Sequence, residues 1–333
     1  MTGLRRAVLR AVVSGTVVFI VMSTSGCSAV QWALEARGVG AARPFSARFG
    51  VDVGDISISS TQLDALGPVW YMDYRWSTPN YGRHERLHMI WDSAEVDRDP
   101  RAIVKGMQTA GASWWSLGNE PNDPNQDNVS AEEYARLYRV FEQLAGQARR
   151  CHIVAGGIGN ADWRWAAAFR EAYRAKYGRY PRVDAWSIHN YILDVGLDPY
   201  DVAEFQRRIE AFASWKEGIG DGHKPLFLTE FGVLYGSGCC DRPVDAPERI
   251  QSFMRQTVDW LVQSEVVSCW AWFATQAEPF NGSLMSGDGT LNELGVIYRD
   301  LASEDAGQSR PSSCDACCGG SMATRVAGSA HLT

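Results

Sequence analysis

The stretch Leu226-Phe-Leu-Thr-Glu230-Phe-Gly232 places a carboxylate after a short apolar run, and Trp115-Ser-Leu-Gly-Asn119-Glu120-Pro121 does the same earlier in the chain. Each apolar run has the length of a buried strand. A (β/α)8 barrel brings the C-terminal ends of its parallel strands to one mouth, so acids at two such ends would face a common pocket. We therefore predict an α/β fold, a single-domain (β/α)8 TIM barrel, with Glu120 and Glu230 at its mouth.

Runs of strand length recur along the chain, and most are followed by a loop and then a helical pattern. Eight such runs are found, at 47–53, 69–74, 87–91, 113–118, 152–156, 183–190, 225–231 and 267–273. Strands that alternate with helices indicate a parallel sheet, and eight units indicate that the sheet closes.

Capping residues predict where several helices begin and end. Ser130 and Glu133 have the spacing of a capping box after the fourth run, and a stripe of aromatic and leucine residues follows them at helical spacing. Asp162 predicts the start of the next helix and Gly178 its end. Asp198, followed by proline, predicts the start of a third helix.

The 333 residues divide into four predicted segments. A signal peptide covers 1–26, a linker 27–46, the barrel 47–302 and a disordered tail 303–333. The barrel segment has about the length, roughly 250 residues, that this architecture needs. The tail segment is rich in Ser and Gly and loses all periodicity.

The N-terminus has the pattern of an export signal. Arginines within the first ten residues precede an apolar run at 11–22 and then small residues that lead to Cys27. Residues 24–27 resemble a lipobox, in which the cysteine is lipidated, although Thr24 stands where Leu is usual. We expect an exported protein, either secreted or lipid-anchored at the cell envelope through Cys27.

Composition argues against several classes of partner. A net charge of −7 and a pI near 5.5 disfavour nucleic acid, because no basic face would offset the phosphate charge. Cys151 and Cys269 lie in predicted strands and are expected to be buried thiols. The tail motif at 314–318 has only one Cys-x-x-Cys pair, which is weak evidence for zinc. We expect a monomer that needs no metal and no cofactor.

The two acids suggest cleavage of a glycosidic bond. That reaction uses one carboxylic acid to protonate the leaving oxygen and one carboxylate to attack or to activate water. Ordinary surface or paired carboxylates are the simpler interpretation, but the apolar flanks and strand-end positions of Glu120 and Glu230 favour catalysis. His189 by itself is equally compatible with a core histidine that has its hydrogen bonds satisfied.

Five motifs in the order of the predicted strands resemble clan A of the glycoside hydrolases. They are Asn119-Glu120 after the fourth run, His189-Asn-Tyr191 at the end of the sixth, Glu230 at the end of the seventh, Trp270-Ala-Trp272 in the eighth, and the closing segment 291–298. Within the clan, the segments 69–74, 89–91 and 119–122 look most like the β-1,3-glucanase-type glycosyl hydrolase catalytic-core family.

The resemblance implies a retaining mechanism with Glu120 as acid/base and Glu230 as nucleophile. In a retaining site the two carboxyl groups lie about 5 to 5.5 Å apart. Asn119 would bind the sugar 2-hydroxyl group, and Tyr191 would donate a hydrogen bond to Glu230, with His189 on the same face of the strand.

The resemblance also implies an aromatic binding surface. Trp272 would form the floor under the reacting sugar, because the C–H face of a pyranose packs on an aromatic plane. Trp70, Tyr71 and Trp91 would line flanking subsites. With 13 tryptophans in the chain, a core position is the competing interpretation for each of these tryptophans.

We therefore expect hydrolysis of a polysaccharide or oligosaccharide, best a β-glucan, with endo or exo action left open. The alternative is a catalytically silent barrel that binds glycans at the cell surface. Gly156-Gly157-Ile-Gly159 invites a nucleotide-binding interpretation but lacks the Lys-Ser/Thr of a phosphate loop. We expect it to be a tight turn that lets the backbone approach the barrel mouth.

Overall fold

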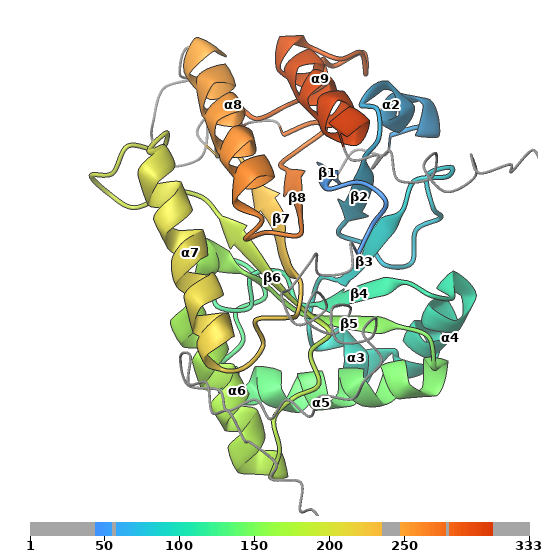
Figure 1. Cartoon of the computed structure of the whole chain (residues 1–333). Helices are drawn as coiled ribbons and strands as arrows, with labels where there is room; N and C mark the ends of the chain where they lie inside the picture. The colour runs from blue at the N-terminus through green and yellow to red at the C-terminus, as the bar shows by residue number, and fades with distance from the viewer. Residues whose placement is uncertain (1–43, 55–57, 235–246, 278–279, 309–333) are drawn as a thin grey trace, which may run out of the picture. The chain divides into compact units, whose positions relative to one another are not determined.

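Parallel strands close into a barrel in sequence order, each paired with the next and the last with the first (Figure 1). The structure is a computed structural model, and it describes residues 44–54, 58–234, 247–277 and 280–308. The predicted (β/α)8 barrel and all eight predicted strands are confirmed. The strands are β1 (Phe49–Val53), β2 (Trp70–Asp73), β3 (Arg86–Ile90), β4 (Trp114–Leu117), β5 (His152–Ile158), β6 (Ala185–Asn190), β7 (Leu226–Phe231) and β8 (Cys269–Trp272).

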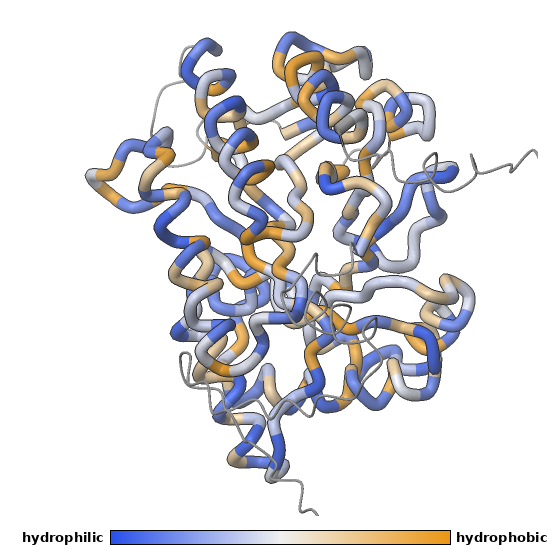
Figure 2. The backbone as a smooth tube through the Cα atoms, viewed as in Figure 1, coloured by the Kyte–Doolittle hydropathy of each residue, from blue (hydrophilic) through white to orange (hydrophobic). Residues whose placement is uncertain are grey.

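Helices connect the strands and pack around them. They are α2 (Ser60–Ala65), α3 (Glu95–Arg98), α4 (Pro100–Ala110), α5 (Ala131–Ala148), α6 (Trp163–Tyr177), α7 (Val202–Gly218), α8 (Pro247–Ser264) and α9 (Glu293–Gln308), with one 3-10 turn, η1 (Gly159–Ala161). Figure 2 shows hydrophobic and hydrophilic stretches alternating along the helices, as expected of helices with one buried face.

The helix caps predicted from the sequence are confirmed in part. The Ser130 hydroxyl accepts from the Glu133 amide and begins α5, but the Glu133 side chain binds Arg136, so the reciprocal half of the capping box is missing. Asp162 begins α6 and Gly178 ends it with a left-handed φ of 72°. The prediction for α7 is wrong by one turn, because the capping side chain is Asp201.

Side chains of the barrel separate into two apolar layers. Those that point into the barrel fill its N-terminal half, and they include Trp70, Met72, Leu87, Met89, Val154, Ala185, Phe227, Cys269 and Ala271. Those that point outward join the helices in a larger core. This arrangement follows from the alternation of side chains along a strand, and it leaves the C-terminal half of the interior to polar groups.

The structure extends the barrel beyond the predicted segment 47–302 at both ends. Phe45, which was assigned to the linker, is buried, and its ring stacks on Trp70 at a centroid distance of 4.6 Å. Helix α9 continues to Gln308, so the predicted boundary at Ala302 is wrong. The buried Asp305 in its last turns forms an ion pair with Arg48. A polar face on this helix hid its continuation in the sequence.

Several predictions fall on residues outside the described part of the chain. These are the signal peptide 1–26, lipidation of Cys27, the linker up to 43 and the cysteine-rich tail from 309 onward. Cys151 and Cys269 are buried free thiols, as predicted. Among the described residues, no helix combines the length and the apolar character needed to cross a membrane.

Candidate active site

Glu120 and Glu230 lie at the C-terminal ends of β4 and β7, as predicted. Leu228 and Phe231 both belong to the outer core although three positions separate them. The register of β7 against β8 is irregular between these two residues. A regular strand would turn Glu230 to the same side as Leu228. The irregularity therefore lets Glu230 face the barrel mouth.

Glu120 is held by a strained turn. Its φ is +45°, a left-handed value that is uncommon outside glycine, and its amide donates to the Gly157 carbonyl at 2.9 Å. Such conformations persist where the surrounding structure imposes them and are concentrated at functional sites. The turn after β4 and the end of β5 thus fix the direction of this carboxylate.

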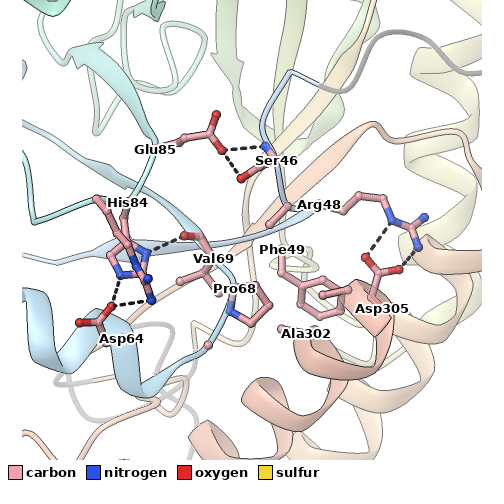
Figure 3. Close-up of a pocket in the computed structure, with 14 residues that line it drawn as sticks. Ser46, Arg48, Phe49, Asp64, Pro68, Val69, His84, Glu85, Ala302 and Asp305 are labelled. Carbon is pink, nitrogen blue, oxygen red and sulfur yellow. Dashed lines mark hydrogen bonds and ion pairs between the residues drawn. The ribbon is translucent and has the colours of Figure 1, made fainter. Parts of the chain in front are cut away.

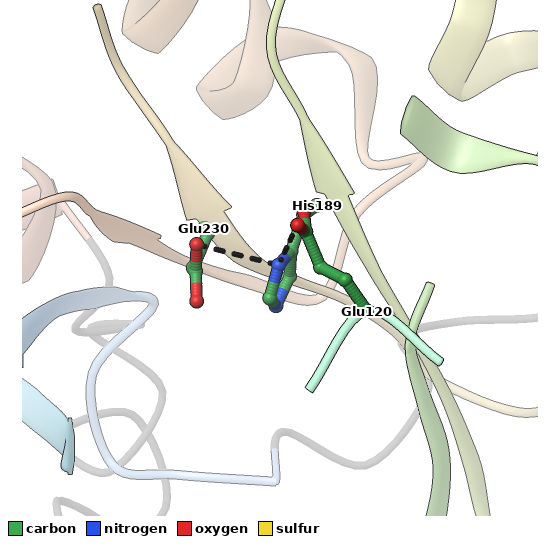
Figure 4. Close-up of side chains that lie close together, drawn as sticks. All are labelled: Glu120, His189 and Glu230. Carbon is green, nitrogen blue, oxygen red and sulfur yellow. Dashed lines mark hydrogen bonds and ion pairs between the residues drawn. The ribbon is translucent and has the colours of Figure 1, made fainter. Parts of the chain in front are cut away.

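His189 on β6 lies between the two acids (Figure 4). Its Nδ1 is 3.1 Å from Glu120 Oε1 and 3.3 Å from Glu230 Oε2. Nδ1 and one oxygen of each carboxylate all lie within 4.8 Å of one another. That spacing would also admit a metal ion, but the hydrogen bond of His189 to Glu120 and its ion pair with Glu230 account for it, and a two-carboxylate hydrolysis needs no ion.

Two tyrosine hydroxyl groups bind the Glu230 carboxylate from opposite ends. Tyr191 donates to Oε2 at 2.9 Å, as predicted, and Tyr74 donates to Oε1 at 2.7 Å. Tyr74 was not foreseen as a site residue, although its position directly after β2 is the signal that would have found it. Each hydrogen bond favours the ionised carboxylate over the protonated form.

Burial and charge act in opposite directions on the pKa of Glu230. Burial raises it, the nearby His189 lowers it, Glu120 raises it, and the two tyrosine hydroxyl groups lower it, with a net rise. For His189, burial lowers the pKa and the two carboxylates raise it, again with a net rise. His189 and the two tyrosine hydroxyl groups therefore offset part of the cost that burial places on the ionised Glu230 carboxylate.

Glycines at the end of β5 and directly after it let the backbone approach both functional side chains. A Cβ at Gly159 would lie 3.3 Å from the Glu120 carboxyl group, and a Cβ at Gly157 would lie 3.3 Å from His189 Nε2. Gly157 also has a φ of +79°, which other residues rarely adopt. The prediction of a tight turn holds only for Gly159, which begins η1, because Gly156 and Gly157 belong to β5, where the register against β6 shifts.

Asn119 is buried beside the acid, and its amide nitrogen donates to Gln126 Oε1 at 3.2 Å. Its Oδ1 has no hydrogen-bond partner among the described residues. A buried acceptor without a partner is costly, so the atom is suited to a ligand hydroxyl group. Binding of the sugar 2-hydroxyl group by Asn119 stays a prediction.

The prediction that Trp272 forms the floor under a sugar is wrong. Its side chain has 0% exposure, its indole nitrogen donates to the Gly282 carbonyl at 2.8 Å, and Phe231 packs edge-on against it at 5.1 Å. Strand alternation turns Trp272 into the outer core. The next residue, Phe273, is half-buried and packs edge-on against Tyr191 at 6.3 Å. Phe273, directly after β8, therefore contacts one of the two tyrosines that bind Glu230.

Two of the three predicted subsite aromatics also lie away from the mouth. Trp70 points into the N-terminal half of the barrel, where it stacks on Phe45. Tyr71 lies in the outer core, and its hydroxyl accepts from the Tyr81 amide at 3.0 Å. Trp91, directly after β3, is 37% exposed. Of these three predicted residues, Trp91 alone is exposed enough to contact a substrate.

A cavity of about 670 Å³ lies at the other end of the barrel (Figure 3). Residues around the N-terminal ends of β1 to β3 and helix α9 line it. Its charged groups are paired with one another: His84 lies 3.0 Å from Asp64, and Arg48 pairs with Asp305. The cavity lacks the two facing acids, so the catalytic site is the mouth at Glu120 and Glu230.

One family model and several solved structures are similar to this chain. The model of the glycosyl hydrolase catalytic core family matches residues 56–298. No curated protein matches the chain.

Several solved structures share the fold. A GH128 (subgroup II) endo-β-1,3-glucanase from Sorangium cellulosum is 24% identical with a TM-score of 0.60, over 76% of this chain and 98% of that one. A subgroup I enzyme from Amycolatopsis mediterranei, in complex with laminarihexaose, is 22% identical with a TM-score of 0.61, over 76% and 99%. A curdlan-specific exo-β-1,3-glucanase from Blastomyces gilchristii is 20% identical with a TM-score of 0.57, over 77% and 99%.

Proposed function

The chain belongs to the glycosyl hydrolase catalytic core family, and we propose that this glycosidase cleaves β-1,3-linked glucan with retention of anomeric configuration. Glu230 is the nucleophile and Glu120 the acid/base. The observation that carries the proposal is the approach of the two carboxylates, which bring one oxygen each to within 4.8 Å. Retaining enzymes need about 5 to 5.5 Å between the carboxyl groups, whereas inverting enzymes need about 6.5 to 9.5 Å.

The reaction has two steps. Glu230 attacks the anomeric carbon while Glu120 protonates the oxygen of the leaving sugar, which gives a glycosyl ester on Glu230. Glu120, now a carboxylate, takes a proton from water as that water attacks the same carbon and releases Glu230.

The groups around Glu230 support both steps. Tyr74 and Tyr191 hold its two oxygens in fixed positions, so the attacking lone pair keeps its direction. His189 stabilises the negative charge when Glu230 leaves the ester. Its contact with Glu120 couples the two acids through one imidazole.

The substrate class rests on the similar structures and on the mouth of the barrel. Similar solved structures are those of β-1,3-glucanases, and some hold laminari-oligosaccharides. The exposed ring of Trp91 and the free acceptor of Asn119 are suited to the apolar and hydroxyl faces of a sugar. A net charge of −7 does not oppose a neutral polysaccharide.

Export follows from the N-terminal sequence and is part of the proposal. Arginines, an apolar run and small residues up to Cys27 support secretion or lipid anchoring at the cell envelope. A glucan-degrading enzyme in either place meets its substrate outside the cytoplasm. Labelling of the expressed protein with a radioactive fatty acid, with a Cys27→Ser variant as control, separates the two forms.

The test is incubation of the purified chain with β-1,3-, β-1,4- and β-1,6-glucans, xylan and mannan, with NMR detection of the first anomer released. Cleavage of β-1,3-glucan with the β-anomer released first supports the proposal. Release of the α-anomer would exclude retention. Binding of a laminari-oligosaccharide without any product would favour the silent glycan-binding barrel.

Two variants assign the roles of the acids. Glu230→Gln removes the nucleophile and abolishes turnover. Glu120→Ala removes the acid and leaves activity only toward substrates with good leaving groups, whose departure needs no proton. Glu132→Gln, on the exposed face of α5, is the matched control and keeps full activity. Full activity in the Glu230→Gln protein would remove Glu230 as nucleophile.

A further inference from the structure

Asp52 on β1 is a buried acid that the two-step reaction does not use. Phe49, Val51 and Val53 face the outer core, so alternation turns Asp52 into the barrel. Its side chain has 0% exposure, and its backbone carbonyl accepts from the Thr275 amide at 2.8 Å. β1 thus fixes a carboxyl group in the polar half of the interior, below the mouth.

Neither oxygen of the Asp52 side chain has a hydrogen-bond partner among the described residues. Glu230, by contrast, receives hydrogen bonds from Tyr74 and Tyr191 and lies next to His189. A buried ionised carboxylate without partners costs far more free energy than a neutral one. A negative charge shared by these two acids therefore belongs on Glu230.

The titratable groups around Asp52 also favour a neutral Asp52 and a negative charge on Glu230. Burial, and then the charge of Glu230, raise the pKa of Asp52 well above its ordinary value. The other titratable groups that interact with Asp52 are the hydroxyl groups of Tyr74 on the β2 side, Tyr191 on the β6 side and Tyr298 on α9. These phenols are neutral, and each has its pKa raised further by Asp52, so none of them supplies a positive charge.

We propose that Asp52 is a positioning residue that stays a neutral carboxylic acid through turnover and thereby confines the single negative charge of the Asp52–Glu230 pair to Glu230. The inference rests on the proposed function, in which Glu230 must be ionised to attack. It adds one requirement to that function: of the two acids, Asp52 carries the proton and Glu230 carries the charge.

A neutral Asp52 matters most in the second step. Glu230 leaves the glycosyl ester as an anion, and an ionised carboxylate below it would repel the charge that develops there. A protonated Asp52 avoids this repulsion and keeps the polar interior filled. An amide would serve equally well, whereas a methyl group would leave a cavity next to the nucleophile.

Infrared difference spectroscopy of the whole chain tests the protonation directly. The C=O stretching band of a protonated carboxyl group at neutral pH should be present in the wild type and absent from Asp52→Asn. In Glu230→Gln the band of Asp52 should disappear at lower pH than in the wild type, because the repelling charge is gone. A purely structural Asp52 would not respond to Glu230. Absence of the band from the wild-type minus Asp52→Asn difference spectrum would overturn the proposal.

Kinetics on a soluble β-1,3-glucan give the second readout. Asp52→Asn should keep kcat within a few-fold, with the acid limb of kcat/KM unmoved. Asp52→Ala should lower kcat by about 10- to 100-fold at unchanged KM, the range expected for a displaced reacting group. An acid limb that moves down by about one pH unit in Asp52→Asn would show that Asp52 is charged in the wild type. Wild-type kcat in Asp52→Ala would also overturn the proposal.

The two readouts separate this inference from the proposed function. If Asp52→Ala does not fold, Asp52→Asn and the infrared band still decide the question. If the wild-type chain cleaves no glucan, the proposed function fails, while the band still reports whether Asp52 holds a proton.

Discussion

Replacement of Tyr74 by Phe tests the environment of the nucleophile most sharply. The ring stays, and the change removes one of the two hydroxyl groups that donate to Glu230, the one at 2.7 Å from Oε1. A hydrogen bond to a charged group contributes about 1.5 to 3 kcal/mol. One pKa unit corresponds to about 1.4 kcal/mol, so the pKa of Glu230 should rise by about 1 to 2 units.

The direction of the effect on rate follows from the ionised form of Glu230. The hydroxyl group stabilises the carboxylate, and without it the proton is held to higher pH. The acid limb of kcat/KM should therefore move up by about 1 to 2 pH units. Tyr191→Phe, which removes the 2.9 Å hydrogen bond to Oε2, should move it in the same direction.

The Tyr74→Phe change should also alter how the free energy of unfolding depends on pH. Burial raises the pKa of Glu230 in the folded chain above the value of 4.5 for an unperturbed Glu. In the pH window between these two values the folded state binds more protons, so the free energy of unfolding falls as pH rises through it. Tyr74→Phe extends that window upward, and its loss of stability relative to the wild type should grow from acid toward neutral pH.

The assay is the pH dependence of kcat/KM on a soluble β-1,3-glucan, with Tyr138→Phe as control. The buried Tyr138 hydroxyl donates to the Arg182 carbonyl at 3.0 Å, away from the barrel mouth. Its loss should lower stability by about 1 kcal/mol and leave the acid limb in place. Superimposed acid limbs for Tyr74→Phe and the wild type, or an equal shift in Tyr138→Phe, would refute the reasoning.

Three further predictions concern the glycines near the barrel mouth, the tryptophans and the partly exposed ion pairs of Glu142. Gly157→Ala should destabilise the chain by at least about 1 kcal/mol and lower kcat, whereas Gly146→Ala, which meets nothing within 4 Å, should be neutral or stabilising in chemical denaturation. Trp272→Ala should cost about 3 to 5 kcal/mol of stability, whereas Trp91→Ala should raise KM with little effect on melting; equal melting temperatures for the two variants would contradict the assignment. Burial raises the pKa of Glu142, but its hydrogen bonds lower it further, so the net shift is downward. The partner side chains Arg139 and Arg179 are 35% and 45% exposed, so Glu142→Gln should lose only about 1 kcal/mol at neutral pH. Its difference from the wild type should shrink as pH falls below 4.5.

The sequence predicted the barrel because its signals are local. Each strand appears as an apolar run, and the residues that end two of these runs are Glu120 and Glu230. The common mouth of a parallel barrel then brings these acids together without any knowledge of side-chain packing. His189 and Tyr191 were assigned to the site through the resemblance of their motif to clan A, at the end of the sixth strand.

The two ends of the barrel segment were harder to predict from the sequence, because they depend on contacts between residues far apart in the chain. Phe45 belongs to the barrel through its stacking on Trp70, and the last turns of α9 belong to it through Asp305 and Arg48. Neither contact has a local pattern. The polar sequence after Ala302 therefore looked like the start of a tail.

The sequence by itself determined the order of the strands, the closed barrel and the pair of acids at its mouth. Only the tertiary structure decided which neighbours those acids have. The irregular register between Leu228 and Phe231 turns Glu230 inward, and alternation along β8 buries Trp272. Closure of the barrel also brings Tyr74 to Glu230 and isolates Asp52 from any partner in the described chain. Register and closure arise from pairing between strands far apart in sequence, so no single stretch of residues contains them.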